Sequence, residues 1–303
     1  MASEPVANDQ PGTAMASDQS SPAVAAKLTL GGGNGIITGG GSGIGKETGF
    51  SLAESGVEGV VFADINEEAA EAAAEESKQY ATNPKYRAVA FKVDVTKEED
   101  VQRMVNRTEK EFGRIDYLIN SAGIGNESME FISNLDTAAF MKTLHVNVLG
   151  TMLCMKAVTK VMQKQVPLVY PGTGRHPSRS LGRGSIVNLG SVSSKIAYQR
   201  MMPYATSKHA VIALTEGAAL DCKGDLIRVN AVCPSWVNTP MMDRSFELVP
   251  TLDKTVKKFS PLQRLAEVDE VVDFIVFLLS PSSTYINGTS TLIDAGLSLT
   301  ANA

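Results

Sequence analysis

The chain has 303 residues, of which 43% are hydrophobic and 20% charged, which is typical of a globular protein large enough for one α/β domain. The formal net charge of −5, without a basic stripe, argues against nucleic acid or an anionic membrane as the main partner. No apolar run reaches the roughly 18 residues that a membrane-spanning helix needs, so no membrane span is expected.

Residues 1–27 are rich in Ala, Ser, Pro, Asp and Gln, and they contain neither an apolar signal core nor arginine. This composition predicts a disordered tail rather than a secretory signal or a mitochondrial transit peptide, so we expect a cytoplasmic protein. Three cysteines in apolar segments, without a C-x-x-C spacing, indicate buried free thiols: Cys154, Cys222 and Cys233. The three histidines form no metal-ligand pattern, so no metal site is expected.

After the tail, short apolar runs alternate with segments of helical periodicity. Strands are predicted at residues 36–38, 60–63, 88–93, 115–120, 185–189, 227–232 and 289–294. Helices are predicted at residues 44–54, 67–80, 98–112, 136–164, 203–223 and 268–279. This alternation predicts an α/β fold: one doubly wound Rossmann-type domain with a mostly parallel, seven-stranded sheet flanked by helices.

Two segments interrupt the alternation. Residues 166–183 are dense in Pro, Gly, Ser and Arg, which predicts a long surface loop inserted between a helix and the fifth strand. Residues 241–261 follow the sixth strand and lack a regular pattern. Because ligands bind beyond the carboxyl ends of parallel strands, this second segment is a candidate substrate lid.

A glycine-rich turn follows the first predicted strand and opens the first helix. Its glycines permit a tight turn and let backbone N–H groups approach a pyrophosphate, and the helix N-terminus adds a favourable dipole. A lone glycine-rich loop is weak evidence, but the strand–turn–helix context strengthens it. The cofactor-binding candidates in this turn are Gly39, Ser42, Gly43, Ile44 and Gly45.

Asp64 ends the second strand, about twenty residues beyond the glycine turn, where an acidic side chain binds the ribose hydroxyls of NAD. It would repel the 2′-phosphate of NADP, and neither Ser42 nor Ile65 offers a cation for that phosphate, so NAD is the expected cofactor. Asp64 could instead cap the following helix. Further cofactor candidates end strands three and four: Asp94, Val95, Asn120, Ala122 and Gly123.

Tyr204 and Lys208 lie four residues apart in a predicted helix, which places both side chains on one face. A free tyrosine has a pKa of about 10, too high for a base near neutral pH. A neighbouring lysine cation favours the phenolate and lowers that pKa, so the pair could exchange a proton with a hydroxyl or carbonyl oxygen. The alternative is a solvated helix face that carries both residues by chance.

Together these residues resemble the short-chain dehydrogenase/reductase family in its classical form, over about residues 28–296. The matching segments are TGGGSGIG at 38–45, Asp64, DV at 94–95, NSAG at 120–123, Asn147 in NVLG, SIVNLGSVSS at 185–194, YATSK at 204–208 and PSWVNTP at 234–240. The resemblance implies an NAD(P)-dependent oxidoreductase acting on CH–OH groups, with residues 28–303 as its catalytic domain.

The resemblance also implies a catalytic tetrad of Asn147, Ser191, Tyr204 and Lys208. In the family, Tyr204 would take the alcohol proton and Ser191 would hydrogen-bond the same oxygen. Lys208 would lower the tyrosine pKa and bind the nicotinamide ribose, and Asn147 would hold a water. Each has a structural alternative, such as a helix bend at Asn147 or a turn cap at Ser191. Beyond Tyr204 and Lys208, the implied nicotinamide contacts are Pro234, Val237 and Thr239.

The chain departs from the family pattern at the glycines before the first strand, at Ser121 and at Ser235, none of which is expected on the proton or hydride path. The predicted substrate side is mostly apolar and includes Ser193, Tyr198, Trp236, Met241 and Met242, beside Ile124, Gly125 and Val192. No arginine or lysine is expected there. We therefore expect a hydrophobic secondary alcohol or ketone of terpenoid, steroid or polyketide size as the small-molecule partner.

By the same resemblance the protein is expected to form a homo-oligomer, either a dimer or a tetramer. Two alternative functions remain open. One is an NADPH-dependent ketoreductase with the same tetrad, against which Asp64 argues. The other is a non-catalytic dinucleotide-binding scaffold on the same fold, which would be free to lose Tyr204 or Lys208.

Overall fold

Seven parallel strands form the central sheet of the computed structural model, which describes residues 29–172 and 175–300. The predicted tail at residues 1–27 lies outside the described residues. The strands, in sheet order, are β3 (Arg87–Lys92), β2 (Gly59–Asp64), β1 (Asn34–Thr38), β4 (Tyr117–Asn120), β7 (Gly184–Leu189), β8 (Ile227–Pro234) and β9 (Ser290–Ile293). From β1 the chain adds strands β2 and β3 on one side of the sheet, and it then adds β4 and the later strands on the other side. Because the order of the strands switches between β1 and β4, a ligand crevice is expected at the carboxyl ends of these two strands.

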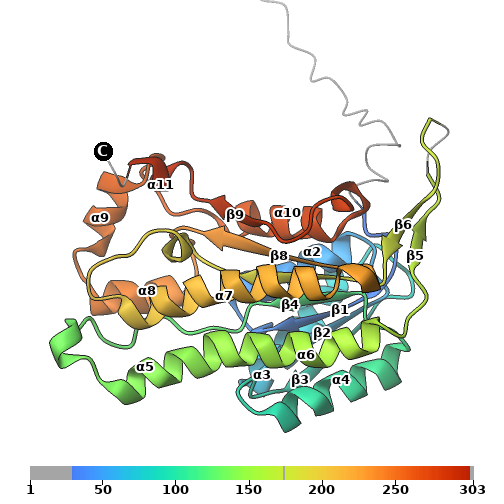
Figure 1. The fold of residues 1–303 in the computed structure, drawn as a ribbon, viewed down its shortest axis with the longest axis horizontal. Helices are drawn as coiled ribbons and strands as arrows, with labels where there is room; N and C mark the ends of the chain where they lie inside the picture. The colour runs from blue at the N-terminus through green and yellow to red at the C-terminus, as the bar shows by residue number, and fades with distance from the viewer. Residues whose placement is uncertain (1–28, 173–174, 301–303) are drawn as a thin grey trace, which may run out of the picture.

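Helices cover both faces of this sheet (Figure 1). The helices on one face are α2 (Gly43–Glu54), α3 (Glu67–Ser77) and α10 (Val268–Leu279), and those on the other are α4 (Glu98–Phe112), α5 (Thr137–Leu144), α6 (Thr151–Met162) and α7 (Met202–Asp221). Alternate residues of each strand enter two separate apolar cores, because successive side chains of a strand point to opposite faces. The predicted doubly wound α/β fold is therefore confirmed.

The helix predicted at residues 136–164 forms, but a π-helical segment at His145–Gly150 separates α5 from α6. Asp136 caps α5 by accepting hydrogen bonds from two backbone N–H groups. Among the described residues, Thr137–Met162 is long and apolar enough to cross a membrane, a test that the core helix of a soluble protein also meets. Its inner side here packs against α4, β4 and β7.

The expected long loop at residues 166–183 contains a β-hairpin instead. Strands β5 (Leu168–Tyr170) and β6 (Arg179–Gly182) pair in antiparallel fashion and project from the end of the sheet opposite α8 and α9 (Figure 1). Arg179 fixes the hairpin, because its guanidinium stacks on Tyr170 and donates to the Pro281 carbonyl. Turn-forming residues dominate the segment and hid these two short strands from sequence analysis.

The segment at residues 241–261 is more regular than expected, since it contains α8 (Pro240–Leu248) and α9 (Leu252–Phe259). Thr239 caps α8, and Pro240 occupies its first turn, as helix starts favour. The two ends of this segment are joined by two hydrogen bonds, since Asn238 N donates to the Ala266 carbonyl and Ala266 N donates to the Trp236 carbonyl, each at 2.9 Å.

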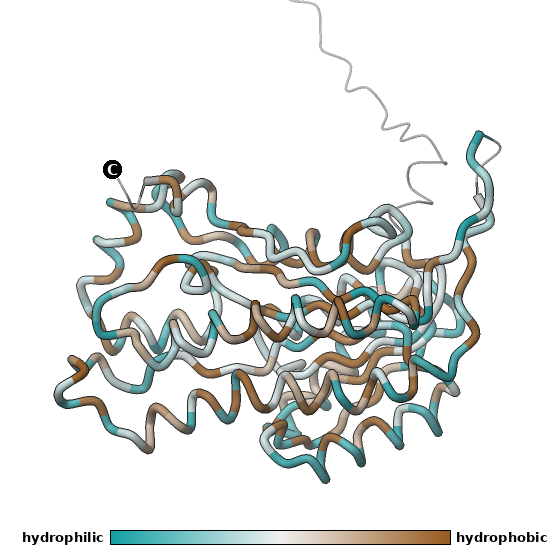
Figure 2. The backbone as a smooth tube through the Cα atoms, in the orientation of Figure 1, coloured by the Kyte–Doolittle hydropathy of each residue, from teal (hydrophilic) through white to brown (hydrophobic). Residues whose placement is uncertain are grey.

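Figure 2 shows hydrophilic residues along much of α4 and at the hairpin, away from the apolar centre.

Candidate active site

The glycine turn between β1 and α2 is shaped by close backbone contacts. Gly39 has a φ of +69°, and a Cβ added there would lie 2.8 Å from the Ala122 nitrogen. A Cβ on Gly45 would lie only 2.1 Å from the Gly39 carbonyl oxygen. Ser42, the N-cap of α2, makes no side-chain cap bond, so the first-turn N–H groups face outward without that partner. This cradle fits the pyrophosphate of a dinucleotide.

Asp64 lies at the carboxyl end of β2, directly beside the glycine turn. Its carboxylate accepts hydrogen bonds from the Gly41 nitrogen at 3.0 Å and from the Asn66 nitrogen at 2.9 Å. Ser42 and Ile65, the two cofactor candidates that offer no cation, are both exposed. Asn66, rather than Asp64, caps α3, so Asp64 is not needed as the cap.

Sequence analysis missed one cation near Asp64. Lys92 is the partner of Asp64 in the register between β2 and β3, and it is exposed. It shares a surface depression with an acidic helix start formed by Glu67, Glu68 and Glu71. These three carboxylates therefore offset the positive charge of Lys92 in the depression.

The other cofactor candidates have mixed surroundings. Asp94 accepts hydrogen bonds from the backbone N–H and the hydroxyl of Thr96. Burial raises the pKa of Asp94, but these bonds and the Lys97 cation together outweigh burial, so the net pKa lies below its ordinary value. The Asp94 carboxylate thus closes a local turn at Thr96 before α4, whose N-cap residue is Lys97. Val95 is buried next to Gly150.

At the carboxyl end of β4, the Asn120 side chain points into the protein, and the backbone that follows lies against the glycine turn. Asn120 is buried and donates to Asn188 at 2.8 Å, while its Oδ1 has no hydrogen-bond partner. The Ala122 nitrogen donates to the Thr38 hydroxyl at 3.2 Å. Gly123 follows beside the Asn147 amide. These contacts hold the ends of β1 and β4 together, and only backbone of this segment faces the cradle.

The end of β8 leads toward the same cradle. Pro234 is the last residue of β8, and Val237 is buried and pairs with Ala266. The Thr239 side chain lies against the glycine turn, since a Cβ on Gly43 would be 3.4 Å from its Cγ2. Its hydroxyl donates to the Val237 carbonyl at 3.2 Å. Thr239 therefore lies between the glycine turn and the start of α8.

The structure brings Ser191, Tyr204 and Lys208 together. Ser191 directly follows β7 and Gly190, and its hydroxyl accepts from the Ser193 nitrogen at 3.1 Å. Tyr204 and Lys208 occupy the same face of α7, with the Lys208 Nζ 5.6 Å from the centre of the Tyr204 ring. Nζ also donates to the Leu189 carbonyl at 2.7 Å. A phenol, a hydroxyl and an ammonium thus converge at the carboxyl ends of β7 and β8.

Burial dominates the acid–base character of the pair. It raises the pKa of Tyr204, and a hydrogen bond with Ser191 offsets part of that rise. Burial lowers the pKa of Lys208 to about 8. Lys208 therefore remains mostly protonated at neutral pH.

Asn147 lies in the π-helical segment and acts as a clamp. Its amide donates to the Ile124 carbonyl and to the Ser207 hydroxyl, each at 3.0 Å, and its Oδ1 accepts from the Ile124 nitrogen at 2.8 Å. The Ser207 hydroxyl in turn donates to the Tyr204 carbonyl at 2.7 Å. The Asn147 side chain therefore ties the segment after β4 to the helix that carries Tyr204.

The predicted substrate residues differ in their exposure. Met241 is 40% exposed and packs over Gly125, whereas Met242 is buried. Ser193 is buried within the turn after β7, and Trp236 is partly buried. Tyr198 is half-buried, and its pKa is raised by burial and by the carboxylate of Asp294. Met241, Trp236 and Tyr198 thus offer mainly apolar surface at the rim.

Three residues at this rim were missed by sequence analysis. Asn126 donates to the Arg200 carbonyl at 2.9 Å, and its Oδ1 accepts from the Tyr204 nitrogen at 3.3 Å. The Arg200 guanidinium lies 4.1 Å from the centre of the Phe131 ring. Arg200 also has a φ of +66°, a strained conformation for a residue other than glycine. Sequence analysis expected no arginine or lysine on the substrate side and did not consider Arg200, because no motif marks this residue.

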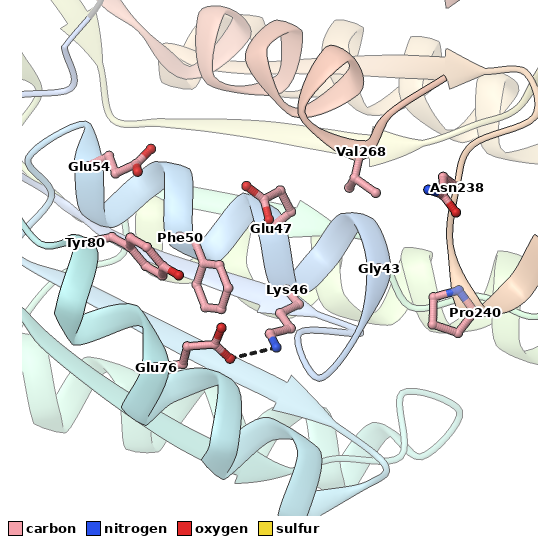
Figure 3. Close-up of a pocket in the computed structure, with 10 residues that line it drawn as sticks. All are labelled: Gly43, Lys46, Glu47, Phe50, Glu54, Glu76, Tyr80, Asn238, Pro240 and Val268. Carbon is pink, nitrogen blue, oxygen red and sulfur yellow. Dashed lines mark ion pairs between the residues drawn. The ribbon is translucent and has the colours of Figure 1, made fainter. Parts of the chain in front are cut away.

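A separate surface pocket of about 450 Å³ lies behind the glycine turn, on the outer side of α2 (Figure 3). Phe50 and Tyr80 stack at one side of it, and Lys46 pairs with Glu76 at 2.7 Å. Glu47 and Glu54 line it as well, and burial with neighbouring carboxylates raises the pKa of Glu47. None of the predicted catalytic residues reaches this pocket.

A Rossmann-type sheet with a glycine turn at its switch point, and with a Ser–Tyr–Lys cluster at the carboxyl ends of β7 and β8, is typical of a nicotinamide-dependent oxidoreductase. A family model described as enoyl-(acyl carrier protein) reductase matches residues 39–298. The short-chain dehydrogenase anuF of Penicillium roqueforti is 45% identical over 264 residues, covering 87% of this chain and 95% of its own length. This chain belongs to the short-chain dehydrogenase/reductase family, in its classical form, and is an NAD(P)-dependent enzyme acting on alcohols.

Solved structures show the same relationship. Levodione reductase is 31% identical with a TM-score of 0.79, over 90% of this chain and 99% of its own. A 7α-hydroxysteroid dehydrogenase, complexed with NADH and 7-oxo glycochenodeoxycholic acid, is 27% identical with a TM-score of 0.77, over 89% of this chain and 96% of its own. The resemblance found in the sequence is thereby confirmed at the level of the family.

Proposed function

We propose that this enzyme transfers a hydride between NAD and a hydrophobic secondary alcohol or ketone, with Tyr204 as the general acid and base. The observation that carries the proposal is the convergence of Ser191, Tyr204 and Lys208 under an apolar rim. The bound nicotinamide would supply or accept the hydride. The protein side of the reaction is then binding, orientation and proton transfer.

The preference for NAD rests on the edge of β2. The Asp64 carboxylate stands beside the glycine turn, fixed by two backbone N–H groups, and can accept hydrogen bonds from ribose hydroxyls. A 2′-phosphate would meet this carboxylate and the carboxylates of Glu67 and Glu68. Lys92 is the one feature here that favours a phosphate. We expect the three carboxylates to outweigh it.

Tyr204 would take the hydroxyl proton onto its phenolic oxygen during oxidation and return it during reduction. Ser191 would donate a hydrogen bond to the substrate oxygen as charge develops there. The Lys208 ammonium would favour the phenolate by attraction once its Nζ turns toward the cofactor ribose. Because burial raises the pKa of Tyr204, this cationic help is needed for proton transfer near neutral pH.

The substrate class follows from the rim. Met241 over Gly125, Trp236 and Tyr198 present apolar and aromatic surface. The 7α-hydroxysteroid dehydrogenase is complexed with 7-oxo glycochenodeoxycholic acid, which is a steroid ketone. That relative supports a bulky secondary alcohol or ketone of terpenoid, steroid or polyketide size. Arg200 at the edge adds one place where a distal acidic group of such a substrate would be tolerated.

The first test is a cofactor titration followed by quenching of Trp236, the single tryptophan. NADH should bind at least about tenfold more tightly than NADPH, and Asp64→Ala should narrow that ratio because it removes the repelling charge. The matched control is Asp221→Ala, an exposed carboxylate at the far end of α7. Equal or tighter NADPH binding by the wild type would contradict the NAD assignment and favour an NADPH-dependent ketoreductase.

The second test is turnover on a panel of secondary alcohols and ketones with the preferred cofactor. Apolar polycyclic and long-chain carbinols should give higher kcat/KM than small hydroxy acids, because the rim is apolar. A clear preference for small carboxylated substrates would overturn the substrate class. Cofactor binding without turnover of any panel member, together with unchanged binding in Tyr204→Phe, would favour a non-catalytic dinucleotide-binding scaffold.

We further propose a cytoplasmic homo-oligomer, either a dimer or a tetramer. Three free, buried thiols suit a reducing compartment. Exposed apolar side chains on α5 and at the end of α7, Met141 and Leu220, are available for subunit contacts. A monomeric mass by light scattering at micromolar concentration would contradict the oligomer.

A further inference from the structure

Ser194 joins two of the proposed catalytic residues through one hydroxyl group. Its Oγ accepts a hydrogen bond from the Ser191 nitrogen at 3.1 Å and donates one to the Lys208 carbonyl at 2.9 Å. The side chain is 3% exposed, so water does not compete for these bonds. One buried oxygen thus connects the turn after β7 to the middle of α7.

The turn around Ser194 is closed on itself. The Ser194 nitrogen donates to the Ser191 carbonyl at 2.8 Å, and the Ser191 hydroxyl accepts from the Ser193 nitrogen at 3.1 Å. Gly190 leaves the space for this arrangement: a Cβ there would lie 2.6 Å from the Cys233 Sγ and 3.2 Å from the Ser194 Oγ. The turn therefore has little freedom except through its bond to α7.

The Lys208 carbonyl does not need this bond for the helix to form. Inside an α-helix it is already the acceptor for the N–H four residues later. The Ser194 bond is therefore additional, and its effect is to fix how α7 is docked against the turn. Since Tyr204 and Lys208 are on α7 and Ser191 is on the turn, it sets the separation of the phenol from the Ser191 hydroxyl.

We propose that Ser194 is a positioning residue for the hydride-transfer reaction, acting through Ser191 and Lys208. It contacts neither substrate nor cofactor. The proposal rests on the proposed function, because it concerns the geometry of the same proton-transfer site. A misplacement of about 1 Å in such a site can cost about a hundredfold in rate, so one lost tether is measurable.

The test compares Ser194→Ala with Ser77→Ala. Ser77 is also fully buried, and its hydroxyl likewise accepts one bond, from Tyr86, and donates one, to the Ala74 carbonyl. It lies at the end of α3, away from the catalytic turn. Each variant loses one accepted hydrogen bond and one hydrogen bond donated to a backbone carbonyl, so both should lower the melting temperature to a similar extent.

Only Ser194→Ala should change catalysis. We expect kcat to fall by about tenfold to a hundredfold, while KM for the cofactor stays within about twofold. Because the Ser191 hydrogen bond lowers the pKa of Tyr204, a loosened Ser191 should also move the acid limb of the pH–kcat profile to higher pH. Ser194→Cys, which keeps the volume and a weaker donor, should give an intermediate kcat.

Two outcomes overturn the proposal. One is a Ser194→Ala enzyme with kcat within about twofold of wild type and an unshifted pH profile. The other is an equal loss of kcat in Ser77→Ala, which would make the effect one of stability alone. If Ser194→Ala does not fold, the same criteria apply to Ser194→Cys, whose wild-type kcat and pH profile would overturn the proposal.

A substrate-independent measurement separates this proposal from the proposed function. Ionisation of Tyr204 is followed by tyrosinate absorbance, with Tyr204→Phe as the blank. Ser194→Ala should raise the midpoint relative to wild type, whether or not any panel substrate is turned over. An unchanged midpoint would overturn the role of Ser194, whereas a silent substrate panel would contradict only the proposed function.

Discussion

The two halves of the active site are built by different means. The cofactor half comprises β1, the glycine turn, α2 and the end of β2, and backbone sterics fix its shape, as at Gly39 and Gly45. The proposed substrate half comprises residues 124–135, 195–201 and 241–266. It is held by side chains that reach between loops, such as Asn126 to Arg200. The comparison suggests that the cofactor half tolerates few substitutions, while the substrate half can change its specificity one contact at a time.

The most damaging single change should be one in the backbone-defined half. Gly45→Ala places a Cβ 2.1 Å from the Gly39 carbonyl oxygen, so the turn must move. The N–H groups would then no longer meet the pyrophosphate, and we expect the Kd for NADH to rise by at least about a hundredfold. Tryptophan quenching measures it.

Gly217→Ala is the matched control for Gly45→Ala. Gly217 lies within α7, and an added Cβ there meets no heavy atom within 4 Å. Alanine in a helix interior is more favourable than glycine by about 1 kcal/mol, so this variant should bind NADH normally and be slightly more stable. NADH affinity within about threefold of wild type in Gly45→Ala would show that the turn is not the rigid element of the comparison.

Lys208 stands between the two halves, and its burial is costly. Its pKa is lowered to about 8 in the folded protein by burial, against about 10.4 when unfolded. Below pH 8 the lysine is charged in both states and the fold bears the full penalty. Between these pKa values the unfolded chain binds more protons, so stability rises with pH.

Lys208→Met should therefore stabilise the cofactor-free protein while abolishing turnover. We expect a gain on the order of 2 kcal/mol at pH 7, reduced by loss of the Leu189 bond, and a smaller gain near pH 10. Urea unfolding at both pH values measures the difference. The control is Lys156→Met, which replaces an exposed lysine on α6. Its effect on the free energy of unfolding should be the same at pH 7 and near pH 10. A variant less stable than wild type at pH 7 would refute the argument.

Sequence patterns were enough to predict the strands and helices in which buried residues recur at a regular spacing. The seven strands of the sheet and helices such as α4 were predicted to within a few residues, because their apolar positions follow the periods of strand and helix. The cofactor candidates around Gly39, Gly45 and Asp64 were readable for a related reason. Tight turns and strand ends demand particular residue types, so the letters themselves carry the geometry.

The elements that sequence did not reveal depend on contacts between distant segments. Strands β5 and β6 pair only with each other and are short, so neither shows a period of its own. The contacts of Asn147 in the π-helical segment, of Asn126 with Tyr204 and of Ser194 with Lys208 each need a partner many residues away. Thr38 to Ala122 is another such contact. No local sequence pattern predicts which polar side chain will form a hydrogen bond with such a distant partner.

The smallest predicted effect tests the substrate half. Arg200→Ala removes the stacking of its guanidinium on Phe131, which joins residues 124–135 to residues 195–201. An exposed cation–π contact is worth about 0.5–1 kcal/mol, so KM for an apolar substrate should rise about twofold to fivefold, with cofactor binding unchanged. The control is Arg107→Ala on α4, which loses a similar contact with Phe91 of β3 and should leave KM unaltered. A loss of cofactor affinity in Arg200→Ala would mean that the two halves are mechanically coupled, whereas an unchanged KM would mean that the rim is held by Asn126 and the backbone alone.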